Sequence, residues 1–268
     1  MKNSLKIPTL ILLTFILSVH LIAQDKVENR LEVSPRHHEW VELAAGDKTL
    51  KSFIVYPQVS EPVKAVIIIH ENRGLTDWVR NFADQLAAEG YIAFAPDMLS
   101  DFNEEFSQTS DFPSSDDARN AIYELDPKCV SSYLNVAFKY LKNLPAANGR
   151  VSVIGFCWGG SQSFRYATNN PDLKEALVFY GTGPKESIKY MNIQAPVYGF
   201  YGENDQRVNS TIDASKKAMD NYQHIFDYEI YEGAGHAYMR SGDDPDGPEA
   251  NIMARNKSWE RMLMILGQ

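Results

Sequence analysis

Cysteine is scarce in this sequence of 268 residues, which contains only Cys129 and Cys157. Two cysteines are too few for a disulfide framework or for a zinc site built from cysteines. Basic residues are fewer than acidic ones. The chain has 26 lysines and arginines and 35 aspartates and glutamates, which gives a formal net charge of −9. So acidic a chain is poorly suited to binding the phosphate backbone of nucleic acid. We therefore expect no nucleic-acid partner.

Long apolar runs are absent after the N-terminus, where one such run covers residues 7–22. Lys2 and Lys6 lie in front of this run, Ala23 follows it, and charge resumes at Asp25. This order is typical of a secretory signal peptide, so we expect residues 1–23 to be removed and the rest to be periplasmic or secreted. A retained anchor is the alternative, disfavoured because the run is shorter than the roughly 20 residues that a spanning helix needs.

Repeats, low-complexity tracts and interdomain linkers are also absent, and 44% of the residues are hydrophobic. We expect a single domain over residues 24–268 and no stable membrane insertion after the signal is removed. No two histidines show the i, i+4 spacing of a metal site, and the two cysteines lack the C-x-x-C spacing. No metal and no cofactor is therefore expected.

Short apolar segments alternate with longer amphipathic ones along this domain. The segments with strand character lie at 40–43, 50–56, 65–69, 91–95, 151–154, 176–179, 197–201 and 225–231. Apolar residues at helical spacing predict five helices. One begins after Thr76 or Asp77, one begins at Asp126 and Pro127, two begin near residues 158 and 210, and the last covers 248–266. Such alternation predicts an α/β fold with a mostly parallel sheet covered by helices on both faces. The irregular stretch 99–117 is expected to be a loop or a lid over a site.

Catalytic residues in such folds lie just after the strands. The strand at 151–154 is followed by G-F-C-W-G-G over 155–160, which is the cysteine form of the nucleophile elbow. Glycines two residues away on either side of Cys157 let strand and helix approach a nucleophile at positive φ. The helix N-terminus would favour the thiolate and offer free N–H groups to an oxyanion. The alternative for Cys157 is a buried cysteine in a glycine-rich turn, whereas Cys129 has no comparable setting.

A cysteine nucleophile needs a base and an acid that orients it, in the chain order nucleophile, acid, base. Asp205 follows the strand at 197–201, and His236 follows the strand at 225–231, both in loops that contain glycine. Glu203 is a rival for the acid. His70, which follows the strand at 65–69, is the second histidine at a strand end.

The sequence H-E-N-R-G over 70–74 forms the loop after the buried strand at 65–69. In this fold the corresponding loop donates one N–H of the oxyanion hole, here that of Asn72. Glu71 would then point at the elbow, where a carboxylate beside a thiol can take its proton or hold it neutral. The alternatives are that Glu71 pairs with Arg73 or caps the next helix.

These motifs, with A-P-D over 95–97 and G-x-x-H-A-Y over 233–238, together resemble the dienelactone hydrolase family of α/β-hydrolases over about 41–266. The resemblance implies a triad of Cys157, Asp205 and His236, with Glu71 switching the thiol between resting and reactive forms. It implies an oxyanion hole made by the N–H groups of Trp158 and Asn72, and a thioester intermediate. Arg240 matches one of two arginines that bind a substrate carboxylate in the family prototype. The acidic stretch 99–117 offers no second arginine, so the dienelactone itself is not specifically expected.

The expected function is therefore that of an exported cysteine hydrolase, an esterase or lactonase acting on a small carboxylic ester or lactone. A non-catalytic binding module that retains the α/β-hydrolase fold is the alternative, and an intact triad argues against it. A redox role of Cys157 with Cys129 is a third hypothesis, which requires the two Cα atoms to lie within about 7 Å.

Overall fold

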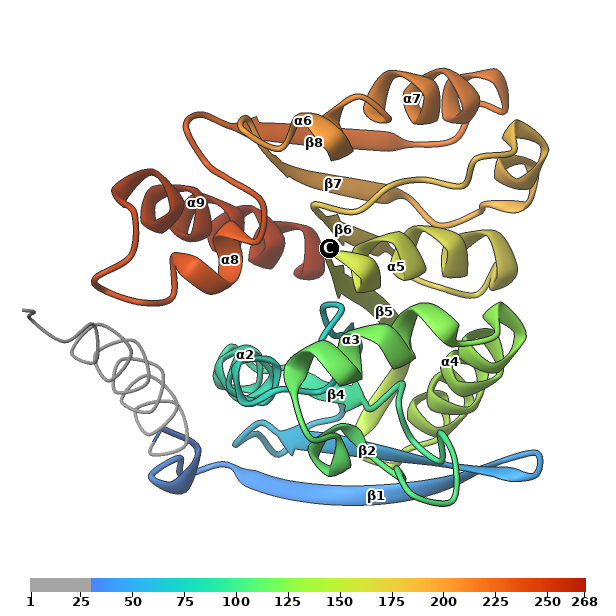
Figure 1. The fold of residues 1–268 in the computed structure, drawn as a ribbon, viewed down its shortest axis with the longest axis vertical. Helices are drawn as coiled ribbons and strands as arrows, with labels where there is room; N and C mark the ends of the chain where they lie inside the picture. Colours follow the sequence, from blue (N-terminus) through green and yellow to red (C-terminus); the bar gives the residue numbers. More distant parts are fainter. Residues whose placement is uncertain (1–29) are drawn as a thin grey trace, which may run out of the picture. The chain divides into compact units, whose positions relative to one another are not determined.

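The computed structural model describes residues 30–268 of the chain, and Arg36–Gln268 forms one compact unit (Figure 1). The expected signal peptide at 1–23, its boundary with the domain at residue 24, and the alternative of a retained anchor lie outside the described residues. Within residues 30–268, no helix combines the length and the apolar character that crossing a bilayer requires.

A central sheet of eight strands organises residues 36–268, in the order β1-β2-β4-β3-β5-β6-β7-β8. All pairs from β4 to β8 are parallel, whereas β2 runs antiparallel to both β1 and β4. The predicted mostly parallel sheet is confirmed. The strands are β1 (His37–Ala45), β2 (Lys48–Tyr56), β3 (Val63–Ile69), β4 (Ile92–Pro96), β5 (Ala147–Phe156), β6 (Ala176–Phe179), β7 (Val197–Gly202) and β8 (Phe226–Tyr231).

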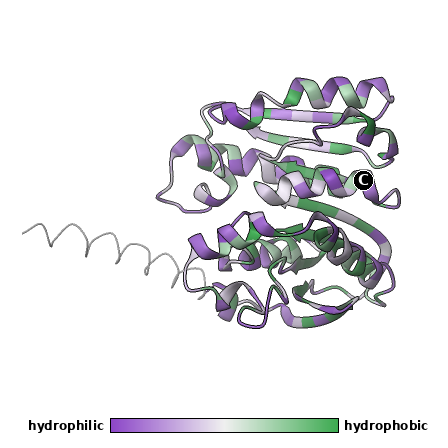
Figure 2. Ribbon diagram, turned by 45° about the vertical axis from the view of Figure 1, so that its right-hand side comes forward, coloured by the Kyte–Doolittle hydropathy of each residue, from purple (hydrophilic) through white to green (hydrophobic). Residues whose placement is uncertain are grey.

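The central strands are apolar on both faces because both faces are covered. In β3, Ile67 and Ile69 belong to one buried cluster, whereas Val66 and Ile68 belong to another. Such strands lack the alternation of apolar and polar residues seen in half-exposed sheets. Figure 2 shows hydrophobic residues concentrated along these strands. This double burial makes the sheet a rigid support for the loops at its carboxyl edge.

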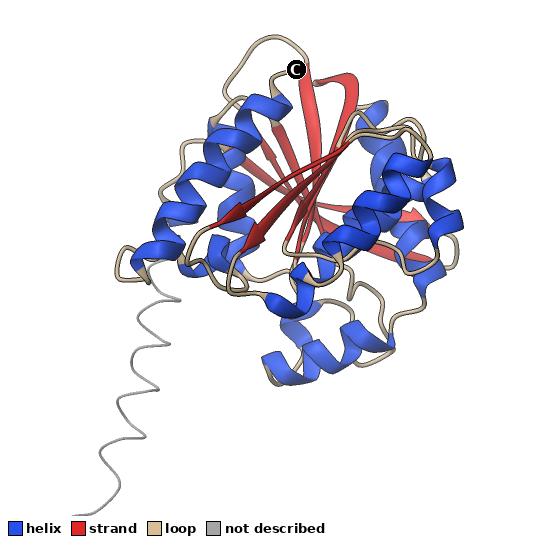
Figure 3. Cartoon of the chain, turned by 90° about the horizontal axis from the view of Figure 1, so that it is seen from above, coloured by secondary structure: helices blue, strands red, loops and turns tan. Residues whose placement is uncertain are grey.

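Helices form a layer on each side of the twisted sheet (Figure 3). One layer packs on the face of the sheet that presents Ile67. It contains α3 (Ser115–Glu124), α4 (Pro127–Lys142), α5 (Trp158–Asn169) and α7 (Ile212–Asn221). The layer whose side chains pack with Val66 contains α2 (Asp77–Ala88), α8 (Tyr238–Ser241) and α9 (Glu249–Leu266). The short α6 (Gln206–Asn209) and the 3₁₀ turns η1 (Thr109–Asp111) and η2 (Ser187–Asn192) complete the elements.

Two predicted helix starts are found at their expected places. Asp126 caps α4, since its carboxylate accepts a hydrogen bond from the Lys128 amide, and Pro127 is the first helical residue. Thr76 precedes α2 as expected, but its side chain makes no capping bond, and its carbonyl accepts from the Val79 amide instead.

The stretch 99–117 is only partly irregular, because α3 begins at Ser115, a helix that the sequence did not indicate. Its buried face consists of Ala118, Ala121 and Ile122 alone, which is too weak an apolar pattern to predict a helix. The preceding loop is fixed at Asp97, whose carboxylate accepts hydrogen bonds from the amide and hydroxyl of Thr109.

Candidate active site

Cys157 lies at the junction between β5 and α5, with φ of 56° and ψ of −115°. Positive φ is rare for a residue with a side chain, and where it occurs at a buried junction it points to a functional constraint. The predicted elbow is therefore present: the chain turns sharply from strand to helix at a half-buried cysteine.

The two glycines that flank the elbow have no room for a side chain. A Cβ on Gly155 would lie 2.0 Å from the carbonyl oxygen of Gly159. A Cβ on Gly159 would lie 2.3 Å from the carbonyl oxygen of His70 and 2.4 Å from that of Ile69. Glycine is thus required so that α5, β5 and the end of β3 can meet around Cys157.

The predicted partners of Cys157 come together beside it. His236 Nε2 lies 3.2 Å from Cys157 Sγ, and His236 Nδ1 lies 2.5 Å from Asp205 Oδ2. Asp205 follows β7 and is buried, whereas the side chain of His236, beyond β8, is 32% exposed. The rival acid Glu203 is turned away, because its carboxylate accepts a hydrogen bond of 2.8 Å from the Gly233 amide.

His236 is held in a setting that favours its charged form. Burial of the ring opposes the charge, but hydrogen bonds to Asp205 and Cys157, together with the charges of those two groups, outweigh it and raise the pKa of His236 to about 9. An imidazole of this kind accepts a proton from the thiol and stays charged next to the resulting thiolate.

Glu71 is buried, and its carboxylate accepts hydrogen bonds from two side chains. Arg240 donates a hydrogen bond of 2.7 Å from Nε to Glu71 Oε2, and Tyr180 donates one of 3.3 Å from its hydroxyl to Glu71 Oε1. The suggested pairing with Arg73 is wrong, because Arg73 instead donates to the Ser115 hydroxyl, and Glu71 caps no helix. The negative charge of Glu71, though partly opposed by burial, raises the pKa of Arg240.

Tyr180 is a site residue that was not identified from the sequence. It follows β6 at φ of 39°, is almost fully buried, and places its ring edge against His236 with 5.1 Å between the ring centroids. Burial and the charge of Glu71 raise the pKa of Tyr180 well above its ordinary value, so its hydroxyl remains a donor. Its position directly after the predicted strand at 176–179 is the feature of the sequence that could have identified it as a site residue.

The two residues expected to supply the oxyanion hole lie at the start of α5 and in the turn after β3. Trp158 is the first residue of α5, so its N–H has no acceptor within the helix. Asn72 lies in the turn after β3, and its side-chain amide donates a hydrogen bond of 3.1 Å to the Tyr123 hydroxyl of α3.

Arg240 reaches the site from α8 with a half-exposed side chain. Only its Nε is engaged by Glu71, and among residues 30–268 its two terminal nitrogens have no hydrogen-bond partner. The outer part of the guanidinium therefore remains able to bind a further carboxylate.

Cys129 and Cys157 are both free and form no disulfide with each other. Cys129 packs against the cluster that contains Ile67, and Cys157 against the cluster that contains Val66. Nothing in this arrangement favours the redox hypothesis. No group of three or more metal-binding side chains is found within the described part of the chain.

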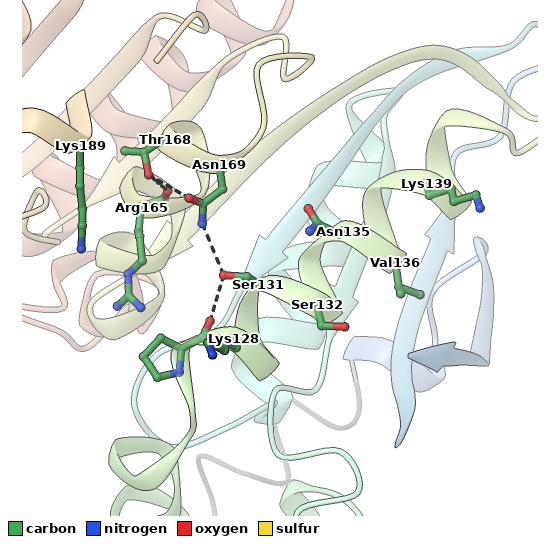
Figure 4. A pocket seen from close by; sticks show the side chains of 11 residues that line it. Lys128, Ser131, Ser132, Asn135, Val136, Lys139, Arg165, Thr168, Asn169 and Lys189 are labelled. Atoms are coloured by element: carbon green, nitrogen blue, oxygen red, sulfur yellow. Dashed lines mark hydrogen bonds between the residues drawn. The ribbon is translucent and has the colours of Figure 1, made fainter. Parts of the chain in front are cut away.

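A groove of about 740 Å³ is lined by residues of α4 and α5 and by Lys189 of η2 (Figure 4). Its charged lining residues are all basic: Lys128, Lys139, Arg165 and Lys189. Cys157, Asp205 and His236 are not among its lining residues.

Comparison with known proteins places this geometry in context. The sequence model of the dienelactone hydrolase family matches residues 50–268. A protein of Escherichia coli (strain K12) assigned as a carboxymethylenebutenolidase is 28% identical over 233 residues, which cover 81% of this chain and 82% of that protein. A dienelactone hydrolase-like promiscuous phosphotriesterase from metagenomic libraries superimposes with a TM-score of 0.73 at 23% identity, covering 87% and 98% of the two chains. The dienelactone hydrolase of Anabaena variabilis superimposes with a TM-score of 0.63 at 18% identity, covering 84% and 96%.

Proposed function

Because the chain belongs to the dienelactone hydrolase family, we propose that it is a hydrolase that cleaves a small carboxylic ester or lactone with Cys157 as the nucleophile. The observation that carries the proposal is a pair of hydrogen bonds that link three side chains. One joins Cys157 Sγ to His236 Nε2 at 3.2 Å, and the other joins His236 Nδ1 to Asp205 Oδ2 at 2.5 Å. Relatives assigned as carboxymethylenebutenolidases and as a lactonase support the substrate class.

Acylation begins when His236 takes the thiol proton and Sγ of Cys157 attacks the carbonyl carbon of the substrate. The electron pair of the carbonyl moves to its oxygen, and the N–H groups of Trp158 and Asn72 stabilise the resulting oxyanion. When this intermediate collapses, the carbon–oxygen bond to the alcohol breaks, and the leaving oxygen receives the proton from His236. A thioester on Cys157 remains.

Deacylation repeats these steps with water as the nucleophile. His236 takes a proton from the water as its oxygen attacks the thioester carbon, and the oxyanion forms again beside Trp158 and Asn72. Cleavage of the carbon–sulfur bond releases the carboxylic acid and returns Cys157 as a thiolate next to protonated His236. Asp205 keeps the imidazole in the orientation that both halves require.

We assign Glu71 the part of a carboxylate that assists the transfer of the thiol proton to His236 only when substrate is present. In the structure its negative charge is matched by Arg240 and by the Tyr180 hydroxyl. A substrate carboxylate bound to the outer nitrogens of Arg240 would share the guanidinium with Glu71 and leave the buried charge of Glu71 less well matched. The less well matched charge of Glu71 would then favour the protonated form of His236, so substrate binding and thiol activation would be coupled.

We also propose that the hydrolase works outside the cytoplasm as one α/β domain over 24–268. The support is the sequence of residues 1–23, with two lysines, an apolar run and Ala23.

A matched pair of substrates tests the proposed reaction and the part of Arg240 in it. We expect wild type to hydrolyse both 4-nitrophenyl acetate and mono-4-nitrophenyl succinate, and R240A to raise KM about tenfold or more for the succinate alone, since a charge-assisted contact is lost. R150A is the control, because Arg150 binds the Gln268 carbonyl at the opposite end of β5. Saturable binding of both esters and of a lactone panel without turnover would contradict the hydrolase and favour a binding module.

A further inference from the structure

We propose that His70 is a positioning residue of the oxyanion hole, which it serves by fixing the peptide plane between Glu71 and Asn72. This inference rests on the proposed function, because an oxyanion arises only if Cys157 attacks a carbonyl group. His70 itself contacts no reacting atom in the proposed reaction.

The imidazole of His70 is fully buried directly after β3, and both ring nitrogens are used by the backbone. Nδ1 lies 2.7 Å from the carbonyl oxygen of Glu71. The Met98 amide donates a hydrogen bond of 3.1 Å to Nε2. Met98 follows β4, so the ring ties the loop after β3 to the loop after the neighbouring strand.

These partners determine the protonation state of the ring. A carbonyl oxygen only accepts, so Nδ1 must carry hydrogen, and a backbone amide only donates, so Nε2 must be bare. His70 is therefore neutral. Complete burial, which outweighs the charge of Asp97 nearby, lowers the pKa of His70 and keeps it in that form.

The hydrogen bond to the Glu71 carbonyl determines where the next N–H points. In a trans peptide the C=O and the following N–H lie in one plane and point in opposite directions. Fixing the Glu71 oxygen against His70 therefore fixes the direction of the Asn72 N–H, which points away from the imidazole. The Asn72 side chain is bound separately by Tyr123, so the turn is held on both sides of this N–H.

His70 also contacts the other half of the oxyanion hole. Its ring stacks on the indole of Trp158, with 5.7 Å between centroids and an angle of 15° between the planes. Its carbonyl oxygen is one of the atoms that a Cβ on Gly159 would strike, at 2.3 Å. One buried side chain thus binds the carbonyl group that precedes the Asn72 N–H and stacks on Trp158, whose N–H is the other group expected to face the oxyanion.

A base role for His70 is incompatible with these contacts. Both nitrogens are committed to backbone groups, so the ring has no free position to receive the thiol proton. The histidine that contacts Cys157 Sγ is His236. Of the two histidines at strand ends, one therefore serves the proton transfer and the other the geometry of the hole.

Two isosteric variants separate the two hydrogen bonds of His70. In H70N the amide nitrogen takes the place of Nδ1 and still donates to Glu71, but the acceptor for Met98 is lost. In H70Q the amide oxygen takes the place of Nε2 and still accepts from Met98, but the donor to Glu71 is lost. We expect H70Q to lower the acylation rate at saturating substrate about 10- to 100-fold with little change in KM, and H70N to stay within about threefold of wild type.

Alkylation of Cys157 by iodoacetamide provides the internal reference, measured in a C129A background. This displacement forms no oxyanion on a carbonyl group, so its rate should be the same in wild type, H70N and H70Q if the triad is intact. The ratio of the acylation rate to the alkylation rate then measures the contribution of the oxyanion hole alone. Urea unfolding of each variant measures its stability.

The inference is overturned if H70Q acylates as fast as wild type, or if both variants lose acylation and alkylation together in proportion to lost stability. Either result would leave the wild-type hydrolase unaffected. If wild type forms no acyl-enzyme from any ester or lactone, the proposed function fails first and the positioning role fails with it.

Discussion

His236 is the residue whose pKa is relevant both to the proposed proton transfer and to the stability of the protein. The ring lies between a buried carboxylate and a half-buried thiol, and its pKa is raised to about 9 although burial acts in the opposite direction. The free energy that favours the charged ring is available to the folded state only, because Asp205 and Cys157 are far from His236 along the unfolded chain. The stability of the protein must therefore depend on pH through this residue.

The D205N variant tests this dependence. With a folded pKa of about 9 against an ordinary 6.5, His236 contributes stability that is fully present below pH 6.5 and lost as the pH rises through about 9. We expect the free energy of unfolding of wild type, measured in urea relative to D205N, to fall between pH 6.5 and 9. Since the imidazole also loses its orientation, kcat should fall about 10²- to 10⁴-fold.

A difference in unfolding free energy that stays constant over this range would contradict the assignment of His236 as the charged partner. E203Q serves as the control, because Glu203 accepts a hydrogen bond from the Gly233 amide in the same loop region and does not contact His236. It should leave the pH dependence as in wild type.

The positions of Cys157, Asp205 and His236 at the edge of the sheet were predictable because each follows a strand and two lie in loops marked by glycine. The bonds to Glu71 were not, since they join residues 109 and 169 positions apart in the chain. Tyr180 looks from the sequence like one more buried aromatic residue, and its part became visible only through its hydroxyl. Sequence patterns determine which residues lie at the edge of the sheet, but not which of them pair there.

Among the elements, the junction between β5 and α5 tolerates the fewest residue types. Gly159 lies where the carbonyls of Ile69 and His70 approach the first turn of α5, so strand β3 and the helix meet backbone to backbone. A helix interior ordinarily favours alanine over glycine by up to about 1 kcal/mol. At this position the close approach must reverse that preference.

The G159A variant should accordingly lower the free energy of unfolding by about 3 kcal/mol, because backbone atoms at 2.3 and 2.4 Å from the new Cβ cannot move as a flexible side chain would. The matched control is G235A, where a Cβ would meet nothing within 4 Å and the backbone has no positive φ. It should change stability by less than about 0.5 kcal/mol. Equal effects of the two substitutions in urea unfolding would contradict the required close approach.

Elements with a strong apolar pattern were predicted well, and those without one were not. The strand at 176–179 is found as Ala176–Phe179, and α4 begins at the predicted cap. By contrast, α3 buries only two alanines and one isoleucine, and its stability depends on the Ser114 cap and on contacts with the loop after β3. Periodicity cannot reveal a helix that is maintained mainly by tertiary contacts.

At the scale of the whole molecule, the two apolar clusters explain why residues 36–268 fold as one unit. Each cluster covers one face of the same sheet, and the side chains that we propose as catalytic come from loops at the carboxyl ends of β3, β5, β7 and β8. The core on both faces thus positions loops from distant parts of the sequence. The excess of 35 acidic over 26 basic residues would become larger if residues 1–23, which include two lysines, were removed as proposed.

Export of the full-length chain is the prediction that belongs to this scale. Expressed in a bacterial host, the protein should be recovered from the periplasmic fraction with Gln24 as its first residue, as determined by intact mass and N-terminal sequencing. A charged residue in the apolar run, as in L13R, should keep the uncleaved chain in the cytoplasm. Recovery of the uncleaved wild-type chain from the membrane fraction would instead indicate a retained anchor.

The central claim is that Cys157 is the nucleophile, and comparison of the two cysteines tests it most directly. Hydrolysis of 4-nitrophenyl acetate should fall at least about 10²-fold in C157A, and the remaining activity should be insensitive to iodoacetamide. C129A should retain both the wild-type rate and the wild-type sensitivity, because Cys129 lies on α4 outside the triad. If C157A hydrolyses the ester as fast as wild type, the assignment of the active site is wrong.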